Sequence, residues 1–350
     1  MNSAHLFPVF DGHNDTLTYL FRSPERSFLQ ENSQGHIDLP RARKGGFAGG
    51  FFAIFPRSTS QQGQKPGTSP TGERSFPALD PQQAHQFTLS VMAYLFRLEK
   101  EAEGQIKVVR TGEQLAWCLQ NDVLATVLHF EGAEAIDPNL DALEVFYQAG
   151  LRSLGLVWSR PNIFAQGVPF TFPHSPDTGP GLTDAGRELV RACNQLRIML
   201  DLSHLNEKGF WDVARLSDAP LVTTHSNVFA ICPSPRNLTN KQLDAIKASE
   251  GMVGLNFALS FLREDGHNNP TTPLDIMVHH IDYLVERMGI DHVGFGSDFD
   301  GGITPSQDIG DVTGLPRLIS ALHNHGYDDA ALRKLTHENW LRVLRKTWQS

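Results

Sequence analysis

Residues 123–158 read VLATVLHFEGAEAIDPNLDALEVFYQAGLRSLGLVW and carry the pattern that decides the fold. Two short apolar, β-rich runs, 123–131 and 151–158, enclose a helix-like stretch at 139–149. Strands that are apolar along their whole length are typical of a parallel sheet covered on both faces. This segment therefore predicts a strand, a covering helix and a second strand parallel to the first.

The same unit repeats along the rest of the 350 residues. Six further β-rich segments occur at 7–12, 48–56, 197–203, 220–225, 251–257 and 292–299. Most are followed by helix-like stretches, at 83–103, 183–196, 206–217, 239–250, 273–289 and 314–325, before a closing one at 328–347. Thr239 and Gln242 form a T-x-x-Q capping box, and Thr183 stands at an expected N-cap.

Eight strands that alternate with helices are most economically arranged as a closed (β/α)8 barrel, the TIM-barrel form of the α/β class. We expect one domain over residues 1–350. The alternative is a doubly wound open sheet. The segment GFGSDF (294–299) begins like a dinucleotide-binding turn, but Phe299 stands where that motif needs its last glycine, so we discount it.

Composition excludes several classes of partner. Lys and Arg number 30 against 39 Asp and Glu, giving a net charge of −9, which disfavours nucleic acid or an anionic membrane surface. No apolar run approaches the roughly 18 residues of a membrane span, and no signal-peptide pattern is visible. The cysteines, Cys118, Cys193 and Cys232, are scattered without metal-site spacing. We therefore expect a cytoplasmic protein that acts on small molecules.

Two long stretches interrupt the alternation. Residues 57–82 are rich in Ser, Gln, Gly and Pro, and residues 159–182 are rich in Pro, Gly and aromatic residues. Loops of this length in a compact domain are usually lids or binding loops. We expect both to border the active site.

Polar side chains gather where the predicted strands end. Five of the eight strand ends carry a histidine or a carboxylate, namely Asp11, His13, Asp15, Glu131, His204, His225, Asp298 and Asp300. In a barrel these ends meet at one face. Three histidines with carboxylates and no cysteine suit Zn²⁺ or a similar divalent metal.

The spacing of these residues suggests how two ions could be held. His13 and Asp15, two apart on a strand, would point to the same face. A carboxylate such as Glu131 could bridge two ions, and an unligated one such as Asp298 could move protons. Taken singly, each residue could instead be a cap, a turn residue or a hydrogen-bonded core residue. Their coincidence at five strand ends favours a metal site.

From FDGHND near its start to HENWLRV near its end, the chain resembles the membrane (renal) dipeptidase family of zinc peptidases, which are amidohydrolase-type metal barrels. The resemblance rests on DGHND (11–15), FEGAEAID (130–137), GLRSLGL (150–156), DLSH (201–204), THSN (224–227), PRNLTN (235–240) and GFGSDFDGG (294–302). The gaps of 21 residues from His204 to His225 and of 11 residues from His225 to Arg236 also match the family.

The resemblance implies a role for each matching residue. His13 and Asp15 would hold one zinc ion, and Glu131 would bridge it to a second. That second ion would be held by His204 and His225. Asp298 would be the acid/base. Arg236 would bind the free carboxylate of the substrate, a role that suits the guanidinium fork but leaves open a purely structural arginine.

Three positions depart from the family pattern. Trp158 stands where the renal enzyme has a histidine that contacts the scissile carbonyl. Its indole N–H can donate one hydrogen bond but cannot become cationic, so it is either a donor or a pocket wall. Ser159, Arg160 and Asn162 are alternative donors. Glu134 follows Ala133 where a histidine commonly follows two glycines, and Ala258 replaces a tyrosine that faces the substrate.

These features predict a dipeptidase that uses two zinc ions and a metal-bridging hydroxide, with C-terminal D-residues among its substrates. One alternative is another binuclear amidase, acting on N-acyl amino acids. A second is a metal- or ligand-binding protein without activity, against which the complete ligand set argues. The resemblance also allows a homodimer, which no surface pattern in the sequence indicates.

Overall fold

The computed structural model describes residues 6–57, 67–68 and 74–349. Within these residues, eight parallel strands are neighbours in the order β1 (Val9–Asn14), β2 (Phe47–Ile54), β6 (Leu124–Glu131), β7 (Leu151–Gly155), β8 (Met199–Asp201), β9 (Val222–Thr223), β10 (Met252–Leu255) and β11 (Val293–Phe295). The ring closes because Asn14 pairs with Phe299 and the Asp298 amide donates to the His13 carbonyl over 2.9 Å. The predicted TIM barrel is confirmed, and the open sheet is excluded.

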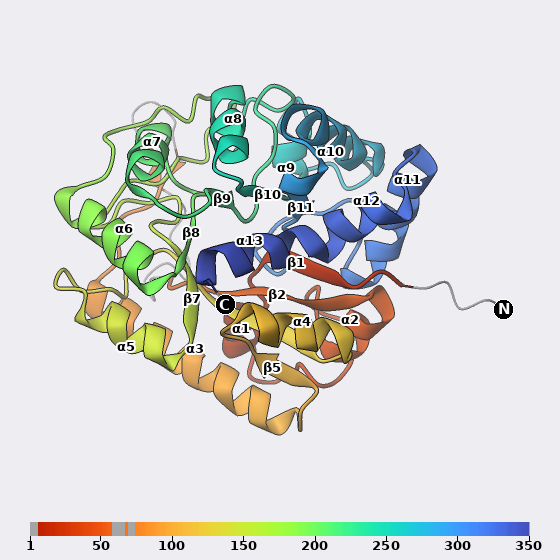
Figure 1. The fold of residues 1–350 in the computed structure, drawn as a ribbon, viewed down its shortest axis with the longest axis horizontal. Coiled ribbons are helices and arrows are strands. Elements are labelled where there is room, and N and C mark those ends of the chain that lie inside the picture. Colours follow the sequence, from red (N-terminus) through yellow and green to blue (C-terminus); the bar gives the residue numbers. More distant parts are fainter. Residues whose placement is uncertain (1–5, 58–66, 69–73, 350) are drawn as a thin grey trace.

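Helices surround this ring (Figure 1). They are α1 (Thr16–Arg22), α2 (Leu39–Gly45), α3 (Pro81–Glu101), α4 (Gly112–Gln120), α5 (Asp141–Ala149), α6 (Asp184–Leu196), α7 (Glu207–Leu216), α8 (Asn240–Ala248), α9 (Leu259–Leu262), α10 (Asp275–Met288), α11 (Leu315–His325), α12 (Asp329–Arg333) and α13 (Asn339–Trp348). Short 3₁₀ turns lie at Ile290–His292 and Val312–Gly314, and a π-helix at Lys334–Glu338 joins α12 to α13.

The predicted helix starts are confirmed where caps marked them. The Thr239 side chain accepts from the Gln242 amide, and the Gln242 side chain reaches back to the Thr239 amide. Thr183 accepts from the amide of Gly186 at the start of α6. Each bond satisfies a backbone group that the first helical turn leaves unpaired.

Two apolar layers support the barrel. The larger lies between strands and helices, and the smaller fills one end of the barrel with residues such as Phe10, Phe51, Met199, Met252 and Trp340. On β6 the alternation of strand side chains divides them: Ala125 and Val127 point into the barrel, whereas Leu128 and Phe130 point to the helices. The same alternation brings His129 and Glu131 inside, nearer the carboxyl end.

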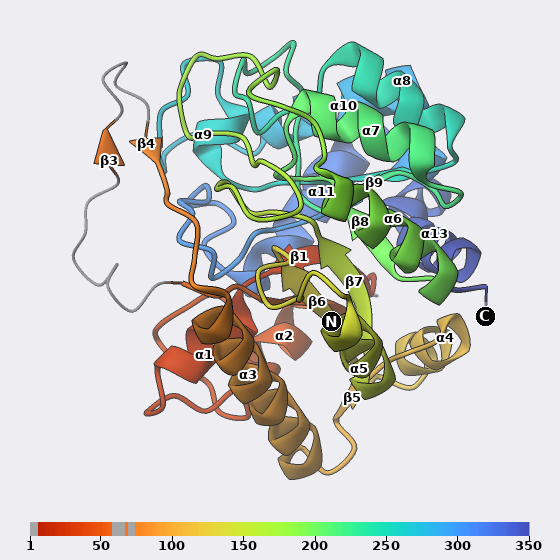
Figure 2. The same cartoon turned by 90° about the vertical axis from the view of Figure 1, so that its left-hand side faces the viewer.

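Of the two predicted loops, only the second lies wholly within the described residues. Residues 58–66 and 69–73 of the first lie outside the described residues, and β3 (Gly67–Thr68) pairs with β4 (Arg74–Ser75) beside the barrel (Figure 2). The second loop, 159–182, contains two isolated antiparallel bridges, Pro161 with Gln166 and Gly167 with Leu205. Its residues 170–172 border a cavity at the carboxyl ends of the barrel strands.

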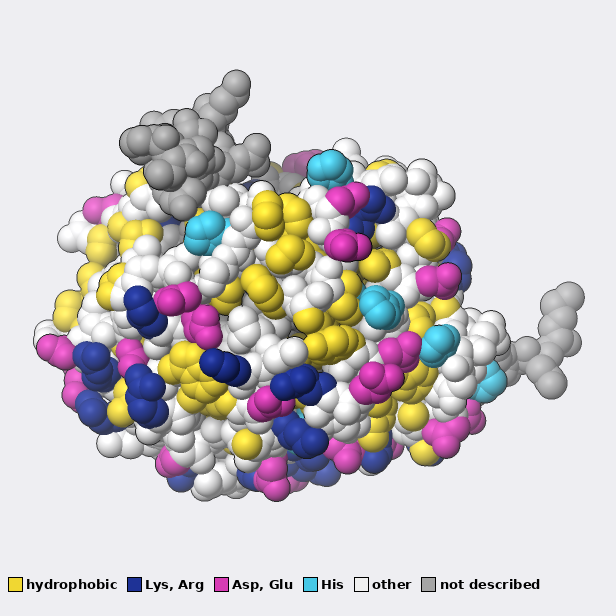
Figure 3. All heavy atoms as spheres, turned by 90° about the horizontal axis from the view of Figure 1, so that it is seen from above, with side chains coloured by type: hydrophobic (Ala, Val, Ile, Leu, Met, Phe, Trp, Pro, Cys, Tyr) yellow, Lys and Arg dark blue, Asp and Glu magenta, His cyan; other side chains and the backbone are white. Residues whose placement is uncertain are grey.

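The charged side chains on one face of the molecule are of mixed sign. On the face seen in Figure 3, acidic side chains lie beside basic ones, so no broad basic field of the kind that binds nucleic acid covers it. In the part of the chain that the structure describes, none of the helices combines the length and the apolar composition needed to cross a membrane.

Candidate active site

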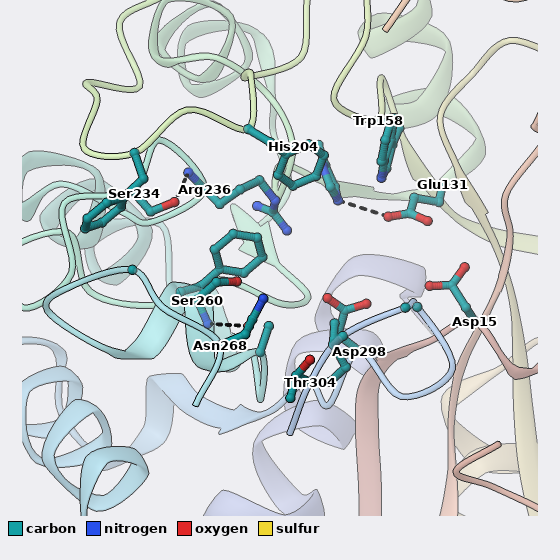
Figure 4. Close-up of a pocket in the computed structure, with 18 of the residues that line it drawn as sticks. Asp15, Glu131, Trp158, His204, Ser234, Arg236, Ser260, Asn268, Asp298 and Thr304 are labelled. Atoms are coloured by element: carbon teal, nitrogen blue, oxygen red, sulfur yellow. Dashed lines mark hydrogen bonds and ion pairs between the residues drawn. The ribbon is translucent and has the colours of Figure 1, made fainter. Parts of the chain in front are cut away.

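A cavity of about 420 Å³ opens at the carboxyl ends of the strands (Figure 4). Asp15, Glu131 and Asp298 point toward one another across it, and Arg236 lies on the side away from Asp15. His13 and His225 are completely buried beside these carboxylates. Most of the polar strand ends singled out in the sequence therefore converge on one place.

His13 lies between two of the carboxylates. Its Nε2 atom is 3.6 Å from Asp15 Oδ2 and 3.7 Å from Glu131 Oε1, and neither ring nitrogen has a hydrogen-bond partner. Burial alone would lower the pKa of His13, but Glu131 and Asp15 outweigh it and raise that pKa to about 10. We expected Asp15 to lie on the strand. It instead follows the end of β1 as the N-cap residue of α1, and the local turn brings it beside His13.

His204 and His225 also approach Glu131, and the His225 ring stacks on that of His13 with ring centres 3.8 Å apart. The two Nε2 atoms are 3.1 Å apart, and they lie 3.0 Å and 3.7 Å from Glu131 Oε1. Burial, and then the positive charge of Arg236 for His204 and of His13 for His225, lowers both pKa values well below the ordinary range. Both rings are therefore held neutral, as metal ligands must be.

The outer nitrogens of these rings are fixed by hydroxyl groups. His204 Nδ1 is 2.8 Å from Ser159 Oγ, and His225 Nδ1 is 2.8 Å from Thr224 Oγ1. Thr224 in turn donates to Asp201 Oδ2 over 2.6 Å. Such partners hold an imidazole in the orientation that a metal ion requires.

Asp298 completes the cluster. One of its oxygens lies within 4.8 Å of ligand atoms of His13 and Asp15. The amide of Asn256 donates to Asp298 Oδ2 over 2.9 Å, and the backbone of Asp298 is left-handed, with φ of 61°. Burial is the main cause that raises the pKa of Asp298 to about 6. A carboxyl group with such a pKa is suited to exchange a proton near neutral pH.

The residues fit bound divalent metal. The unpartnered Nε2 atom of His13 and the Nε2 atoms of His204 and His225 all lie within 3.7 Å of Glu131 Oε1. Burial, followed by the negative charge of Asp15, raises the pKa of Glu131 well above its usual range. This cluster of buried carboxylates is short of positive charge, and bound cations would supply it.

Arg236 is fully buried between the cluster of histidines and carboxylates and the ring of Phe261. Its guanidinium donates to the backbone carbonyls of Ser203 and His225 and lies 5.5 Å from the ring centre of Phe261. Its Nε atom has no partner. Burial lowers the pKa of Arg236 to about 10, so the group remains cationic at neutral pH.

Trp158 lines the cavity, and its three neighbouring candidates do not. The indole packs against Phe55 and Phe170 with ring centres 4.8 Å and 5.3 Å away. The other side chains are engaged elsewhere: Ser159 with His204, Arg160 with Glu134 and Asn162 with the Leu156 carbonyl. Trp158 is therefore the one candidate of the four that lines the described cavity.

Two predicted strand-end carboxylates lie outside the cluster. Asp11 accepts bonds from the amide and hydroxyl of Ser297, which ties β1 to the segment after β11. Asp300 accepts from Thr16 Oγ1 over 2.8 Å and from the His36 amide over 2.6 Å. Both carboxylates therefore hold segments that are distant in sequence together by hydrogen bonds.

The sequence analysis did not identify His129 and Asp201, which lie beside His13. His129 Nε2 is buried without a partner, 3.6 Å from Asp201 Oδ2, and both residues lie within 4.8 Å of His13. The signal was present for His129, which stands two residues before Glu131 on the same strand and so shares its face. Asp201 precedes His204 in the DLSH motif.

Comparisons with known proteins agree with this geometry. A family model described as membrane dipeptidase (peptidase family M19) matches residues 4–350. A metallopeptidase from Rhodobacter sphaeroides, whose crystal structure holds a phosphinate mimic of the dipeptide L-Ala-D-Ala, is 53% identical. The two structures align with a TM-score of 0.93 over 98% of this chain and 100% of that chain.

Two sequence relatives extend the comparison. A Klebsiella pneumoniae protein described as uncharacterized, from the pqqA 5′ region, is 50% identical over 258 residues, which are 74% of this chain and 95% of that protein. Dipeptidase tcpJ of Claviceps purpurea (strain 20.1) is 25% identical over 341 residues, or 96% of this chain and 76% of that protein.

Proposed function

The chain belongs to the membrane dipeptidase family, peptidase family M19, and on that premise we propose that it hydrolyses dipeptides with two zinc ions, including dipeptides that end in a D-residue. It is a metallopeptidase, a hydrolase acting on peptide bonds. The observation that carries the proposal is the convergence of three histidines on Glu131 beside a buried arginine.

In this proposal the ligands divide into two sets that share one carboxylate. His13 and Asp15 would hold one ion, His204 and His225 would hold the other, and Glu131 would be a ligand of both. Bound there, the ions supply Lewis-acid polarisation of the scissile carbonyl and an activated water. Imidazole and carboxylate ligands without thiolates suit zinc.

The remaining steps belong to side chains. Arg236 binds the α-carboxylate of the C-terminal residue and so places the peptide bond beside Glu131. Asp298 takes the proton of the attacking water and passes it to the departing amine, held in position by Asn256. Trp158 walls the pocket, and the relative's L-Ala-D-Ala mimic supports a site that accepts a C-terminal D-residue.

The test is hydrolysis of L-Ala-L-Ala and L-Ala-D-Ala by zinc-loaded protein, beside the N-acetylated form of each. We expect cleavage of the free-amine forms only, and loss of cleavage after a chelator removes the metal. Cleavage of the acetylated forms would identify an amidase for N-acyl amino acids instead. Cleavage of none of the four, at full metal occupancy, would contradict an enzymatic role.

A further inference from the structure

Arg57 is a second cation that lines the substrate cavity, besides Arg236. It lines the cavity with Phe55 and Trp158, and its guanidinium carbon lies 4.9 Å from the centre of the Phe55 ring. Among the described residues, no carboxylate lies within ion-pair distance of it. An arginine stacked on an aromatic ring keeps its N–H donors free for a ligand.

Arg57 and Arg236 stand at opposite sides of the barrel. Arg57 lies three residues beyond the end of β2, which is the second strand of the ring. Arg236 follows β9, the sixth strand, and in a ring of eight the second and sixth strands face each other. A dipeptide whose carboxylate binds Arg236 and whose peptide bond lies at Glu131 therefore extends its N-terminal residue toward β2.

A second arginine, which does not itself line the cavity, interacts electrostatically with Arg57. Arg22 ends α1, and its pKa is lowered by burial and then by the positive charge of Arg57, while the charge of Asp15 raises it. Arg22 also has no ion-pair partner among the described residues and stacks on Phe87 at 5.2 Å. Once two divalent ions are bound, the carboxylates of Asp15, Glu131 and Asp298 no longer balance the positive charge of the cavity.

We propose that Arg57, supported by Arg22, is a specificity-determining residue that binds a carboxylate on the side chain of the substrate's N-terminal residue. This inference rests on the proposed dipeptidase function and names its substrate class: dipeptides that begin with an acidic residue. The faces of Phe55 and Trp158, with ring centres 4.8 Å apart, form the apolar wall for the methylene groups of that side chain.

The test compares L-Glu-D-Ala with L-Gln-D-Ala, which differ only by a carboxylate in place of a carboxamide. We expect the zinc-loaded wild-type protein to favour the Glu substrate about fivefold in kcat/KM, a size that suits an exposed, solvent-screened ion pair. Raising the salt from about 0.05 M to about 0.5 M should reduce the ratio because the Debye length shrinks.

Variants assign the preference to one residue. Arg57→Gln should bring the ratio near one, Arg57→Lys should keep part of it, and Arg57→Glu should favour the Gln substrate. Arg215→Gln is the matched control, since Arg215 is exposed on α7 and pairs with Asp212. The ratio is taken within each protein, so a general loss of folding or metal cancels.

Three outcomes would overturn the assignment. A wild-type ratio near one, with L-Ala-D-Ala cleaved, would remove Arg57 as a specificity residue while leaving the dipeptidase function intact. An unchanged ratio in Arg57→Gln would show that another group binds the carboxylate of the substrate's N-terminal side chain. Cleavage of no dipeptide would overturn the proposed function and this inference with it.

Discussion

Glu131 carries the central charge of the site, because one of its oxygens lies within 3.7 Å of ring nitrogens of His13, His204 and His225. Asp15 and Asp298 add two more buried carboxylates nearby. Buried carboxylates at such distances cannot all ionise without matching cations. Within the protein, the nearby positive charge comes from Arg236 and from His13, whose pKa is raised to about 10, and bound metal ions would supply the rest.

Replacement of one imidazole should therefore remove metal as well as activity. We expect His225→Ala to lower the bound zinc from two ions per chain toward one, since the site loses the imidazole that lies beside the Glu131 oxygen. Elemental analysis of gel-filtered protein measures the ratio. His280→Gln, a buried histidine outside the cluster, is the control. Full zinc content in His225→Ala would remove His225 from the ligand set.

Asp298→Asn should separate metal binding from turnover. The amide has nearly the same shape as the carboxyl group but cannot carry a proton between water and amine. We expect two bound zinc ions and a fall in kcat of about 10²- to 10⁴-fold. Asp300→Asn is the comparison, because Asp300 has the same left-handed backbone yet bonds Thr16 and His36. An active Asp298→Asn protein would refute proton transfer by this residue.

At the scale of elements, α10 is tied to two neighbouring segments by one buried side chain. His280 Nδ1 accepts from the Val228 amide over 3.2 Å, and Nε2 donates to the Leu262 carbonyl over 2.9 Å. One nitrogen accepts and the other donates, so the ring is neutral. Burial is the main cause that lowers its pKa from 6.5 to about 4.

This histidine should make stability depend on pH. The unfolded chain binds the proton more readily, so the contribution of His280 is complete above pH 6.5 and is lost as the pH falls toward 4. Between pH 7 and pH 5 we expect the wild-type protein to lose about 2 kcal/mol more unfolding free energy than His280→Gln. Urea unfolding at the two pH values measures the difference. Equal losses in both proteins would contradict the assignment.

The sequence predicts the elements that carry a strong local pattern and misses those that do not. All eight barrel strands and the caps at Thr183 and Thr239 were predictable, because apolar runs and capping residues are local signals. Strand β5 (Ile106–Val108) and helices α2 and α4 were not. β5 pairs with the first residues of β6, and the later residues of β6 pair with β7, so its place depends on chain geometry that no local pattern shows.

The same limit applies to the site. Strand-end residues such as Glu131 and His225 could be brought together by topology alone, since the carboxyl ends of barrel strands meet. The aromatic contacts of Trp158 could not be predicted in this way, because Phe76 and Phe170 come from the two long loops. The buried ion pair of Arg160 and Glu134 could not be predicted either. Arg160 Nε lies 2.6 Å from Glu134 Oε1, although the residues are 26 positions apart in sequence.

At the scale of the whole molecule, the barrel has one polar end and one apolar end. The carboxyl end holds the buried charges, and the other end is filled by the smaller core layer. Helix α13 crosses that end in Figure 1 and inserts Trp340, which is fully buried. The last helix thus closes the barrel against the first strands.

The closure depends on small residues opposite a large one. The ring of Trp340 lies 5.3 Å from that of Phe51, and its indole N–H donates to the Phe295 carbonyl over 3.1 Å. A Cβ on Gly12 or Gly254 would come within 2.5 Å or 3.0 Å of the Trp340 ring. Those glycines leave the space that the indole occupies, so the packing is fixed from both sides.

Emptying this space should weaken the whole fold. Trp340→Ala should lower the free energy of unfolding by about 3–5 kcal/mol, since it removes a large buried ring, leaves a cavity and unpairs the Phe295 carbonyl. Trp340→Phe keeps much of the ring and should cost less. Urea unfolding of both variants gives the comparison. Exposed Trp117 on α4 supplies the control, and Trp117→Ala should change stability by less than about 1 kcal/mol. If Trp340→Ala unfolded at the same urea concentration as wild type, the last helix would not be what holds this end of the barrel closed.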